Sequence, residues 1–347
     1  MGETGSATID STAAEAVGAV DAAMDAPWLA KRVAWFALNA GRFSVPRVLR
    51  PAYASKVKAA GGTYYTVESA DGERLHCLHL PGDKTASDDA ADRLTVFLMH
   101  GWIECKELHL FRVLPLQRAG HDVVMIDHRG HGGSTGTGIT FGALERDDLR
   151  RVIDDAIERG IGTQRVITMG HSMGAATCLL HAADDARVAG VSAVAPFATI
   201  RGAIEAFQRR IPGVHHFYPR AWVDAGFRHE LDRLGGSFDA ARPVDGLGRI
   251  ASPVLLIEGG RDSLTPPAEH SRRLFDAPGR GPMELVQVPQ ASHFTISKFN
   301  WPSVAERVSR LCADVSRAVA EGRDPAAAID DGRVTVYRDG TIAAMRN

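Results

Sequence analysis

The 347-residue sequence predicts an α/β fold in which helices cover both faces of a mostly parallel sheet. Short apolar runs alternate with segments of helical spacing from about residue 94 to about residue 320. The runs are continuously apolar, which is typical of strands that are buried on both faces. Apolar residues make up 45% of the chain and charged residues 24%, so the composition is that of an ordinary globular protein.

The expected elements begin with a hairpin. Thr63–Glu68 and Arg74–Leu80 are rich in β-forming residues, and the Asp71-Gly72 pair between them is a turn signal. The parallel strands expected after it are 94–99, 122–126, 166–169, 188–195, 254–257 and 285–288, which makes eight strands in all. The helices expected between and after them are 104–118, 144–158, 173–183, 268–275 and 303–320. Because right-handed crossovers bring the carboxyl ends of parallel strands to one edge, ligands should bind at that edge.

Changes in composition divide the chain into five segments. Residues 1–60 form an N-terminal helical extension, which Pro27, Pro46 and Pro51 should break into short helices. The segment 201–249 has no strand pattern but has two helical stretches and many aromatic residues, so we interpret it as a small helical cap. The other segments are the two parts of the core, 61–200 and 250–322, and a C-terminal tail, 323–347, with a hairpin expected about Asp339-Gly340.

An apolar cluster lies in the extension, between Trp28 and Leu38, and it contains Lys31 and Arg32. The favoured interpretation is a helix that packs on the main domain. The alternative is a contact with a membrane or a second subunit, because apolar residues mixed with basic ones suit an interfacial helix. Self-association into a homo-oligomer is left open.

Charge and cysteine usage limit the function classes. The formal net charge is −2, so no field of one sign indicates a nucleic-acid partner. The four cysteines lack metal-ligand spacing and are expected to be buried free thiols. The first 25 residues lack a basic start followed by an apolar run, and no stretch reaches the ~20 apolar residues of a membrane span. The expected location is the cytoplasm. The cysteines are Cys77, Cys105, Cys178 and Cys312.

The most informative motif is Gly170-His171-Ser172-Met173-Gly174, which follows an expected strand and precedes an expected helix. In this context the G-x-S-x-G pattern is typical of a sharp turn that exposes a nucleophilic serine. Glycines are needed on both sides because side chains would collide in so tight a turn. Ser172 is the predicted nucleophile.

A serine hydroxyl needs a base, and the base needs an acceptor that orients it. His293 comes just after the last expected strand, so it should lie at the same sheet edge as Ser172. Asp262 follows the preceding strand, in a glycine-rich turn. We predict His293 as the general base and Asp262 as the acid, with Glu258 as the alternative acid.

Two glycine-containing loops complete the predicted site. His100-Gly101-Trp102 follows the strand 94–99, and its Trp102 N–H should form the oxyanion hole with the Met173 N–H. His100 itself is expected to be structural. The loop from Asp127 to Ser134 lacks the spacing of a phosphate-binding loop and is expected to support the site without direct chemistry. No metal site is predicted.

In their order and separation, these motifs resemble the α/β-hydrolase superfamily over about residues 62–322. The likeness is to the branch with lysophospholipase-like esterases, acylglycerol lipases and serine aminopeptidases. The resemblance implies a triad of Ser172, Asp262 and His293, an oxyanion hole of Trp102 and Met173, and no cofactor. The loop differs from the His-Gly-Gly-Gly of many lipases, and the family pattern does not cover the N-terminal extension or the tail.

The predicted activity is hydrolysis of a carboxylic ester, with a small-molecule ester or acyl compound as substrate. A thioesterase, a serine peptidase or a C–C bond hydrolase would use the same triad, and a catalytically silent binding protein is a further alternative. Haloalkane and epoxide chemistry is disfavoured, because those branches use aspartate where this chain has Ser172. The side chains predicted to contact the substrate are Phe197, Trp222 and Phe294.

Overall fold

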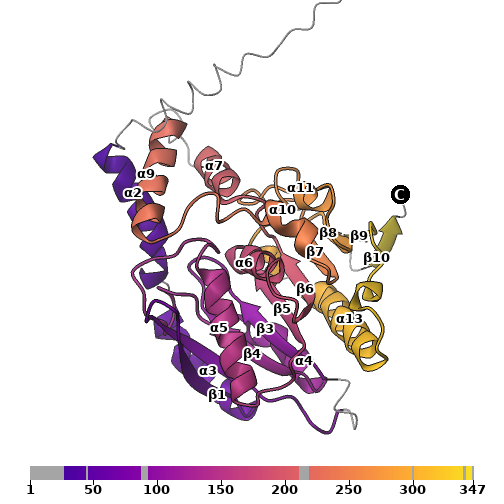
Figure 1. The fold of residues 1–347 in the computed structure, drawn as a ribbon. Helices are drawn as coiled ribbons and strands as arrows, with labels where there is room; N and C mark the ends of the chain where they lie inside the picture. Colours follow the sequence, from indigo (N-terminus) through magenta and orange to yellow (C-terminus); the bar gives the residue numbers. More distant parts are fainter. Residues whose placement is uncertain are drawn as a thin grey trace, which may run out of the picture.

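The computed structural model describes residues 27–43, 46–86, 93–210, 219–298, 301–338 and 341–345. Its centre is a mixed sheet with the strand order β1-β2-β4-β3-β5-β6-β7-β8-β9-β10 (Figure 1). The pairs β1–β2, β2–β4 and β9–β10 are antiparallel, and the other pairs are parallel. The strands are β1 (Thr63–Glu68), β2 (Arg74–Leu80), β3 (Thr95–Met99), β4 (Asp122–Ile126), β5 (Val166–His171), β6 (Val188–Val194), β7 (Val254–Gly259), β8 (Met283–Val288), β9 (Val334–Arg338) and β10 (Thr341–Met345).

Helices cover both faces of this sheet, as the sequence predicts. The helices are α2 (Trp28–Asn39), α3 (Pro46–Ala59), α4 (Leu110–Arg118), α5 (Glu145–Glu158), α6 (Met173–Ala182), α7 (Ile200–Arg210), α9 (Arg220–Arg233), α10 (Pro243–Gly246), α11 (Ser271–Phe275), α12 (Thr295–Lys298) and α13 (Trp301–Ala320). The 3-10 helices are η1 (Ala40–Phe43), η3 (Lys106–His109), η4 (Leu247–Arg249) and η5 (Pro325–Ala328).

Two apolar cores fill the spaces between sheet and helices. One contains buried side chains of α5, α6 and α11, and the other contains buried side chains of α3, α4 and α13. Alternation along the strands divides the side chains between them. In β3, for example, Phe97 and Met99 join the first core, whereas Val96 and Leu98 join the second.

The predicted number of eight strands is wrong: the described residues contain ten. The two extra strands come from the tail, where β9 pairs with β8 and β10 pairs with β9. The tail therefore extends the sheet, because its apolar Val334, Val336 and Tyr337 are buried against the cores. The turn expected about Asp339-Gly340 lies outside the described residues.

In the N-terminal extension, Pro51 does not break a helix as expected but lies within α3. The helical prediction for residues 12–26 lies outside the described residues. Helix α2 begins directly after Pro27 and packs along α9 (Figure 1). Ala34 and Leu38 of α2 are buried in a third apolar core, which also contains side chains of α7 and α9.

The opposite face of α2 is exposed. Trp28 is 69% exposed and Phe36 57%, and Leu29 and Val33 are also on the surface. The alternative of a membrane or subunit contact through this face stays a prediction. None of the described helices is long and apolar enough to cross a membrane. All four cysteines are free and buried, as predicted.

Candidate active site

Ser172 lies in a sharp turn between β5 and α6. Its φ is +54° and its ψ is −115°, a strained conformation for a residue with a side chain. The flanking glycines make the turn possible. A Cβ on Gly170 would lie 2.3 Å from the backbone of Gly174, and one on Gly174 would lie 2.2 Å from the Met99 carbonyl oxygen. The turn therefore holds a half-buried hydroxyl at the carboxyl end of the sheet.

The three residues predicted as a triad meet at this edge. The Ser172 hydroxyl is 2.9 Å from His293 Nε2, and His293 Nδ1 is 2.7 Å from Asp262 Oδ2. Asp262 follows β7 and His293 follows β8, so neighbouring parallel strands bring both side chains to the edge where β5 ends. The hydroxyl can donate to Nε2 while Nδ1–H donates to the carboxylate, which is the geometry that proton transfer from serine requires.

Hydrogen bonds keep the Asp262 carboxylate ionised. Burial alone would raise its pKa, but hydrogen bonds from His293 and Thr265 outweigh the burial and lower the pKa below its usual value. The backbone N–H groups of Leu264 and Thr265 donate to Oδ1 at 2.9 and 2.8 Å. Thr265 Oγ1 donates to Oδ2 at 2.9 Å. The role of Thr265 was not predicted, although its place three residues after Asp262 is the spacing of such a local turn.

The alternative acid, Glu258, lies away from His293 on β7. Its carboxylate accepts a hydrogen bond from the Gln287 side chain. Burial raises its pKa. Of the two carboxylates considered from the sequence, the structure brings only Asp262 to the histidine.

The loop after β3 approaches the serine turn. Met173 is the first residue of α6, where the first N–H groups of a helix have no partner within it. Among the described residues, no hydrogen bond uses the backbone N–H of Trp102 either. Within the part of the chain that the structure describes, the two predicted oxyanion donors are thus N–H groups without a hydrogen-bond partner.

A buried carboxylate that was not predicted links the loop to the serine turn. Glu104 Oε2 accepts hydrogen bonds from the Gly101 N–H at 2.7 Å, from His109 at 2.9 Å and from His171 at 3.3 Å. His171 Nε2 in turn lies 3.1 Å from the carbonyl oxygen of His293. The only sequence signal was a glutamate two residues after Trp102, which does not indicate these partners.

The three predicted substrate-contacting aromatics lie in different surroundings. Phe294 is 51% exposed and its ring packs edge-on against that of His293, with centroids 5.6 Å apart. Phe197 is buried in the third core with Met173. Trp222 is 37% exposed on α9. A cavity of about 320 Å³ lies elsewhere, between α13 and the C-terminal strands, and it is lined by paired arginines and carboxylates.

Comparison with known proteins agrees with this geometry, since a model of the alpha/beta hydrolase family matches residues 96–309. The chain belongs to this family. The α/β-hydrolase is 27% identical over 259 residues to the uncharacterized protein YfhR of Escherichia coli, with 72% of this chain and 82% of that protein covered.

Solved structures share the fold of this α/β-hydrolase at low identity. The esterase Pf2001 of Pyrococcus furiosus superimposes with a TM-score of 0.55 at 20% identity, over 73% of this chain and 93% of that one. A puromycin-hydrolyzing peptidase of Mycobacterium tuberculosis gives a TM-score of 0.57 at 18% identity, over 75% of this chain and 39% of that one. The particular branch expected from the sequence, with lysophospholipases and acylglycerol lipases, is not distinguished by these matches.

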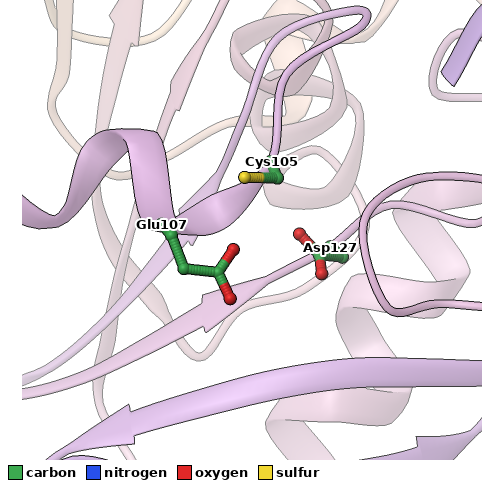
Figure 2. Close-up of side chains that lie close together, drawn as sticks. All are labelled: Cys105, Glu107 and Asp127. Carbon is green, nitrogen blue, oxygen red and sulfur yellow. The ribbon is translucent and has the colours of Figure 1, made fainter. Parts of the chain in front are cut away.

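Behind the site of the α/β-hydrolase, a thiol and two carboxylates lie close together: Cys105, Glu107 and Asp127 (Figure 2). Their positive partner is the buried Lys106, whose Nζ is 2.5 Å from Asp127 and 3.3 Å from Glu107. Burial raises the pKa of the Cys105 thiol, so it stays neutral. One ammonium thus contacts both carboxylates, and we propose no metal here.

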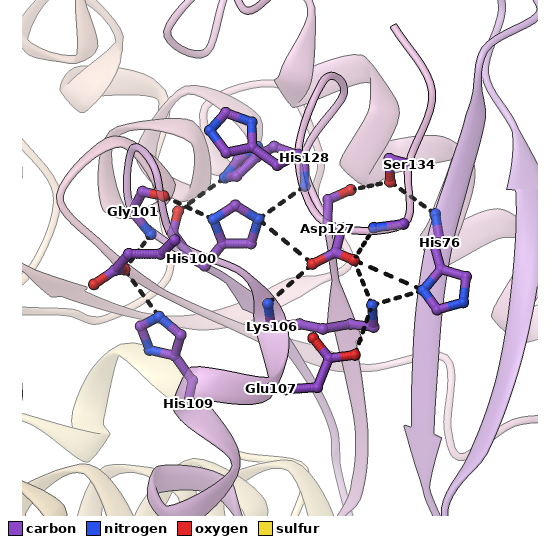
Figure 3. Close-up of polar contacts among 12 residues, drawn as sticks. His76, His100, Gly101, Lys106, Glu107, His109, Asp127, His128 and Ser134 are labelled. Atoms are coloured by element: carbon purple, nitrogen blue, oxygen red, sulfur yellow. Dashed lines mark hydrogen bonds and ion pairs between the residues drawn. The ribbon is translucent and has the colours of Figure 1, made fainter. Parts of the chain in front are cut away.

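The same lysine belongs to a network that supports the loop after β3 (Figure 3). Asp127 accepts from the Lys106 N–H at 3.0 Å and from the Gly133 N–H at 2.8 Å. His100 Nε2 accepts from the His128 N–H at 3.1 Å, and its Nδ1–H donates to the Gly101 carbonyl at 2.7 Å. His100 and the 127–134 loop thus support the loop after β3. None of these hydrogen bonds involves Ser172, Asp262 or His293.

The buried histidines predict a stability that falls with acid. Burial lowers the pKa of His109, His128 and His270 to about 4, and it also lowers that of His100 and His131. In the unfolded chain these groups have a pKa of about 6.5. Unfolding therefore takes up protons between about pH 6.5 and pH 4, and each proton lowers the unfolding free energy by about 1.4 kcal/mol per pH unit.

Because the pKa values of these histidines are lower in the folded protein, their full contribution to stability is present above about pH 6.5 and is lost as the pH falls. We expect urea midpoints to be constant from pH 8 to 7 and to drop steeply from pH 6 to 5. Carboxylates with lowered pKa values, such as Asp127, would contribute only at still lower pH. A midpoint that does not change between pH 7 and 5 would contradict the assignment of these histidines as neutral in the fold.

Proposed function

We propose that the protein is a serine hydrolase that cleaves carboxylic esters through an acyl-enzyme on Ser172. The observation that carries the proposal is the continuous hydrogen-bonded series from Ser172 to His293 to Asp262, with distances of 2.9 and 2.7 Å. An esterase is among the similar folds, and at 20% identity this likeness supports the fold alone.

In the first half-reaction, Ser172 Oγ attacks the ester carbonyl carbon while His293 Nε2 takes the hydroxyl proton. Asp262 stabilises the imidazolium that forms and holds its Nδ1–H. The carbonyl oxygen becomes an oxyanion, which the N–H groups of Trp102 and Met173 would bind. Since α6 begins at Met173, the positive end of its dipole also favours this negative charge. His293 then protonates the leaving alcohol, and the acyl group remains on Ser172.

Water completes the reaction. His293 takes a proton from a water molecule that attacks the acyl-enzyme, and the second tetrahedral intermediate collapses to release the acid and to restore the Ser172 hydroxyl. No cofactor is needed for either half-reaction.

Apolar side chains near the site support an apolar acyl group. Phe294 is exposed beside His293. The Trp102 ring packs edge-on against Phe207, which is also partly exposed, with centroids 6.0 Å apart. Binding of an acyl chain against such a surface would be favoured by about 0.8 kcal/mol for each CH₂ group that is removed from water.

A panel of substrates tests the proposed reaction. It contains p-nitrophenyl esters of two to twelve carbons, an acyl thioester and an aminoacyl p-nitroanilide, the last because one similar fold is a puromycin-hydrolyzing peptidase. We expect the highest kcat/KM among the esters and an increase with chain length. A higher kcat/KM for the thioester or the anilide would assign the same residues to a thioesterase or a peptidase. No turnover of any substrate would favour a binding protein.

A further inference from the structure

The predicted oxyanion loop contains a strained turn. The Glu104 N–H donates to the Gly101 carbonyl at 3.2 Å, so Trp102 and Ile103 are the two central residues of a β-turn. Ile103 has a φ of +57°, a value that normally requires glycine. For a β-branched residue this conformation costs on the order of 1–3 kcal/mol, and it persists only where surrounding contacts hold it.

Different parts of the chain hold the first residue of this turn and its two central residues. Gly101, the first residue, is held by Glu104 and by His100, which belong to the core domain. Of the central residues, Trp102 donates its indole Nε1–H to the Ala37 carbonyl of α2 at 2.9 Å. The Ile103 N–H donates to His131 Nε2 at 3.2 Å.

The N-terminal segment fixes this second contact as well. His131 Nδ1–H donates to the Arg129 carbonyl at 3.1 Å, which leaves Nε2 free of a proton to accept from Ile103. The imidazole packs directly on Gly41 of η1, where a Cβ would lie 2.3 Å from ring atoms Cε1 and Nε2. Only glycine at position 41 lets the ring stay where it accepts the Ile103 N–H.

Helix α2 is itself attached near both of its ends. The Ile139 N–H donates to the Leu38 carbonyl at 3.0 Å. Gly226 of α9 lets the helices approach closely, since a Cβ there would lie 2.6 Å from the Ala30 carbonyl oxygen. The Ala37 carbonyl therefore offers the indole an acceptor at a fixed position.

We infer that α2 and η1, which precede the residues matched by the family model, position the oxyanion hole of this enzyme. The Ala37 carbonyl and Gly41 hold the strained turn in the conformation that presents the Trp102 backbone N–H to the substrate. The Trp102 indole and His131 are positioning groups, and neither touches the reacting atoms. This inference rests on the proposed serine-hydrolase function.

Trp102→Phe tests the first contact, because it removes the indole N–H but keeps an aromatic ring against Phe207. Trp28→Phe is the matched control, since it removes an exposed indole at the start of α2, the end of that helix away from Ala37. A misplaced oxyanion donor weakens the transition state more than the bound substrate. For Trp102→Phe we expect kcat to fall about 10-fold with KM within twofold, as part of the ~10²–10³ that one whole donor contributes.

An inhibitor that mimics the oxyanion gives a second readout. A trifluoromethyl ketone with the preferred acyl chain adds to the serine as a tetrahedral alkoxide, so its inhibition constant should rise by the same factor as kcat falls. Gly41→Ala should give the same pair of changes without altering Trp102, because the added methyl displaces the His131 ring. Thermal unfolding of each variant identifies any loss that comes from misfolding.

The outcomes separate the two proposals. If folded Trp102→Phe and folded Gly41→Ala both keep kcat and inhibitor affinity within twofold of wild type, the inference is wrong although the hydrolase stands. A rise in KM with kcat unchanged, or an equal loss of kcat in Trp28→Phe, would also overturn the inference. If the wild-type protein neither turns over an ester nor binds the ketone, the proposed function fails, and the inference fails with it.

Discussion

Replacement of Ser172 by alanine should lower kcat/KM for the preferred p-nitrophenyl ester by about 10⁴-fold or more. The hydroxyl lies 2.9 Å from His293 Nε2, so its loss removes the attacking atom and leaves the rest of the series in place. Residual hydrolysis would come from the oxyanion donors and from substrate binding. Initial rates measured at saturating ester give kcat, and those at low ester concentration give kcat/KM.

Ser192→Ala is the matched control for this variant. Ser192 is a buried serine on the neighbouring strand β6, so the same hydroxyl is removed without a change at the site. Its activity should stay within twofold of wild type. If Ser172→Ala kept more than about one hundredth of the wild-type kcat, another residue would have to be the nucleophile.

The Asp262→Asn variant should lose about 10⁴-fold in kcat at neutral pH while staying folded. Two backbone N–H groups, those of Leu264 and Thr265, point at Oδ1. An asparagine would therefore place its oxygen there and its NH₂ group at the Oδ2 position, 2.7 Å from His293 Nδ1. The amide would donate to Nδ1, so the histidine proton would move to Nε2, which could then no longer accept the Ser172 proton.

Glu258→Gln makes the same carboxylate-to-amide change on the same strand region, away from the histidine. Glu258 is bonded to the Gln287 side chain, so we expect less than a threefold change in kcat for this variant. Circular dichroism and thermal unfolding of both variants check the fold. Equal losses in Asp262→Asn and Glu258→Gln would contradict the assignment of Asp262 as the orienting acid.

The sequence alone was sufficient for most of the fold, because buried parallel strands are marked by continuous apolar runs. The run 122–126, for example, is the strand β4 (Asp122–Ile126). The tail was different, because whether Val334–Arg338 joins the sheet depends on an edge of β8 that lies far away in sequence. Local patterns do not report such long-range pairings, so ten strands were not expected.

The candidate site was likewise predictable only in part. That Ser172, Asp262 and His293 meet could be predicted because each comes just after a recognisable strand, and the topology then brings strand ends together. Glu104, His131 and Ala37 could not, because their roles come from hydrogen bonds across loops. Ala37 acts through its backbone carbonyl, which no side-chain pattern marks at all. The buried Lys106 was missed for a similar reason, since only the folded chain places it between two carboxylates.

Covalent labelling tests the central claim most directly. The native protein is treated with a fluorophosphonate, digested and examined by mass spectrometry, with Ser172→Ala treated in parallel. We predict one phosphonyl group per chain on the peptide that contains Ser172, and none on the variant. A native, folded protein that stays unmodified, or one that carries the group on a different residue, would contradict the claim that Ser172 is an activated nucleophile.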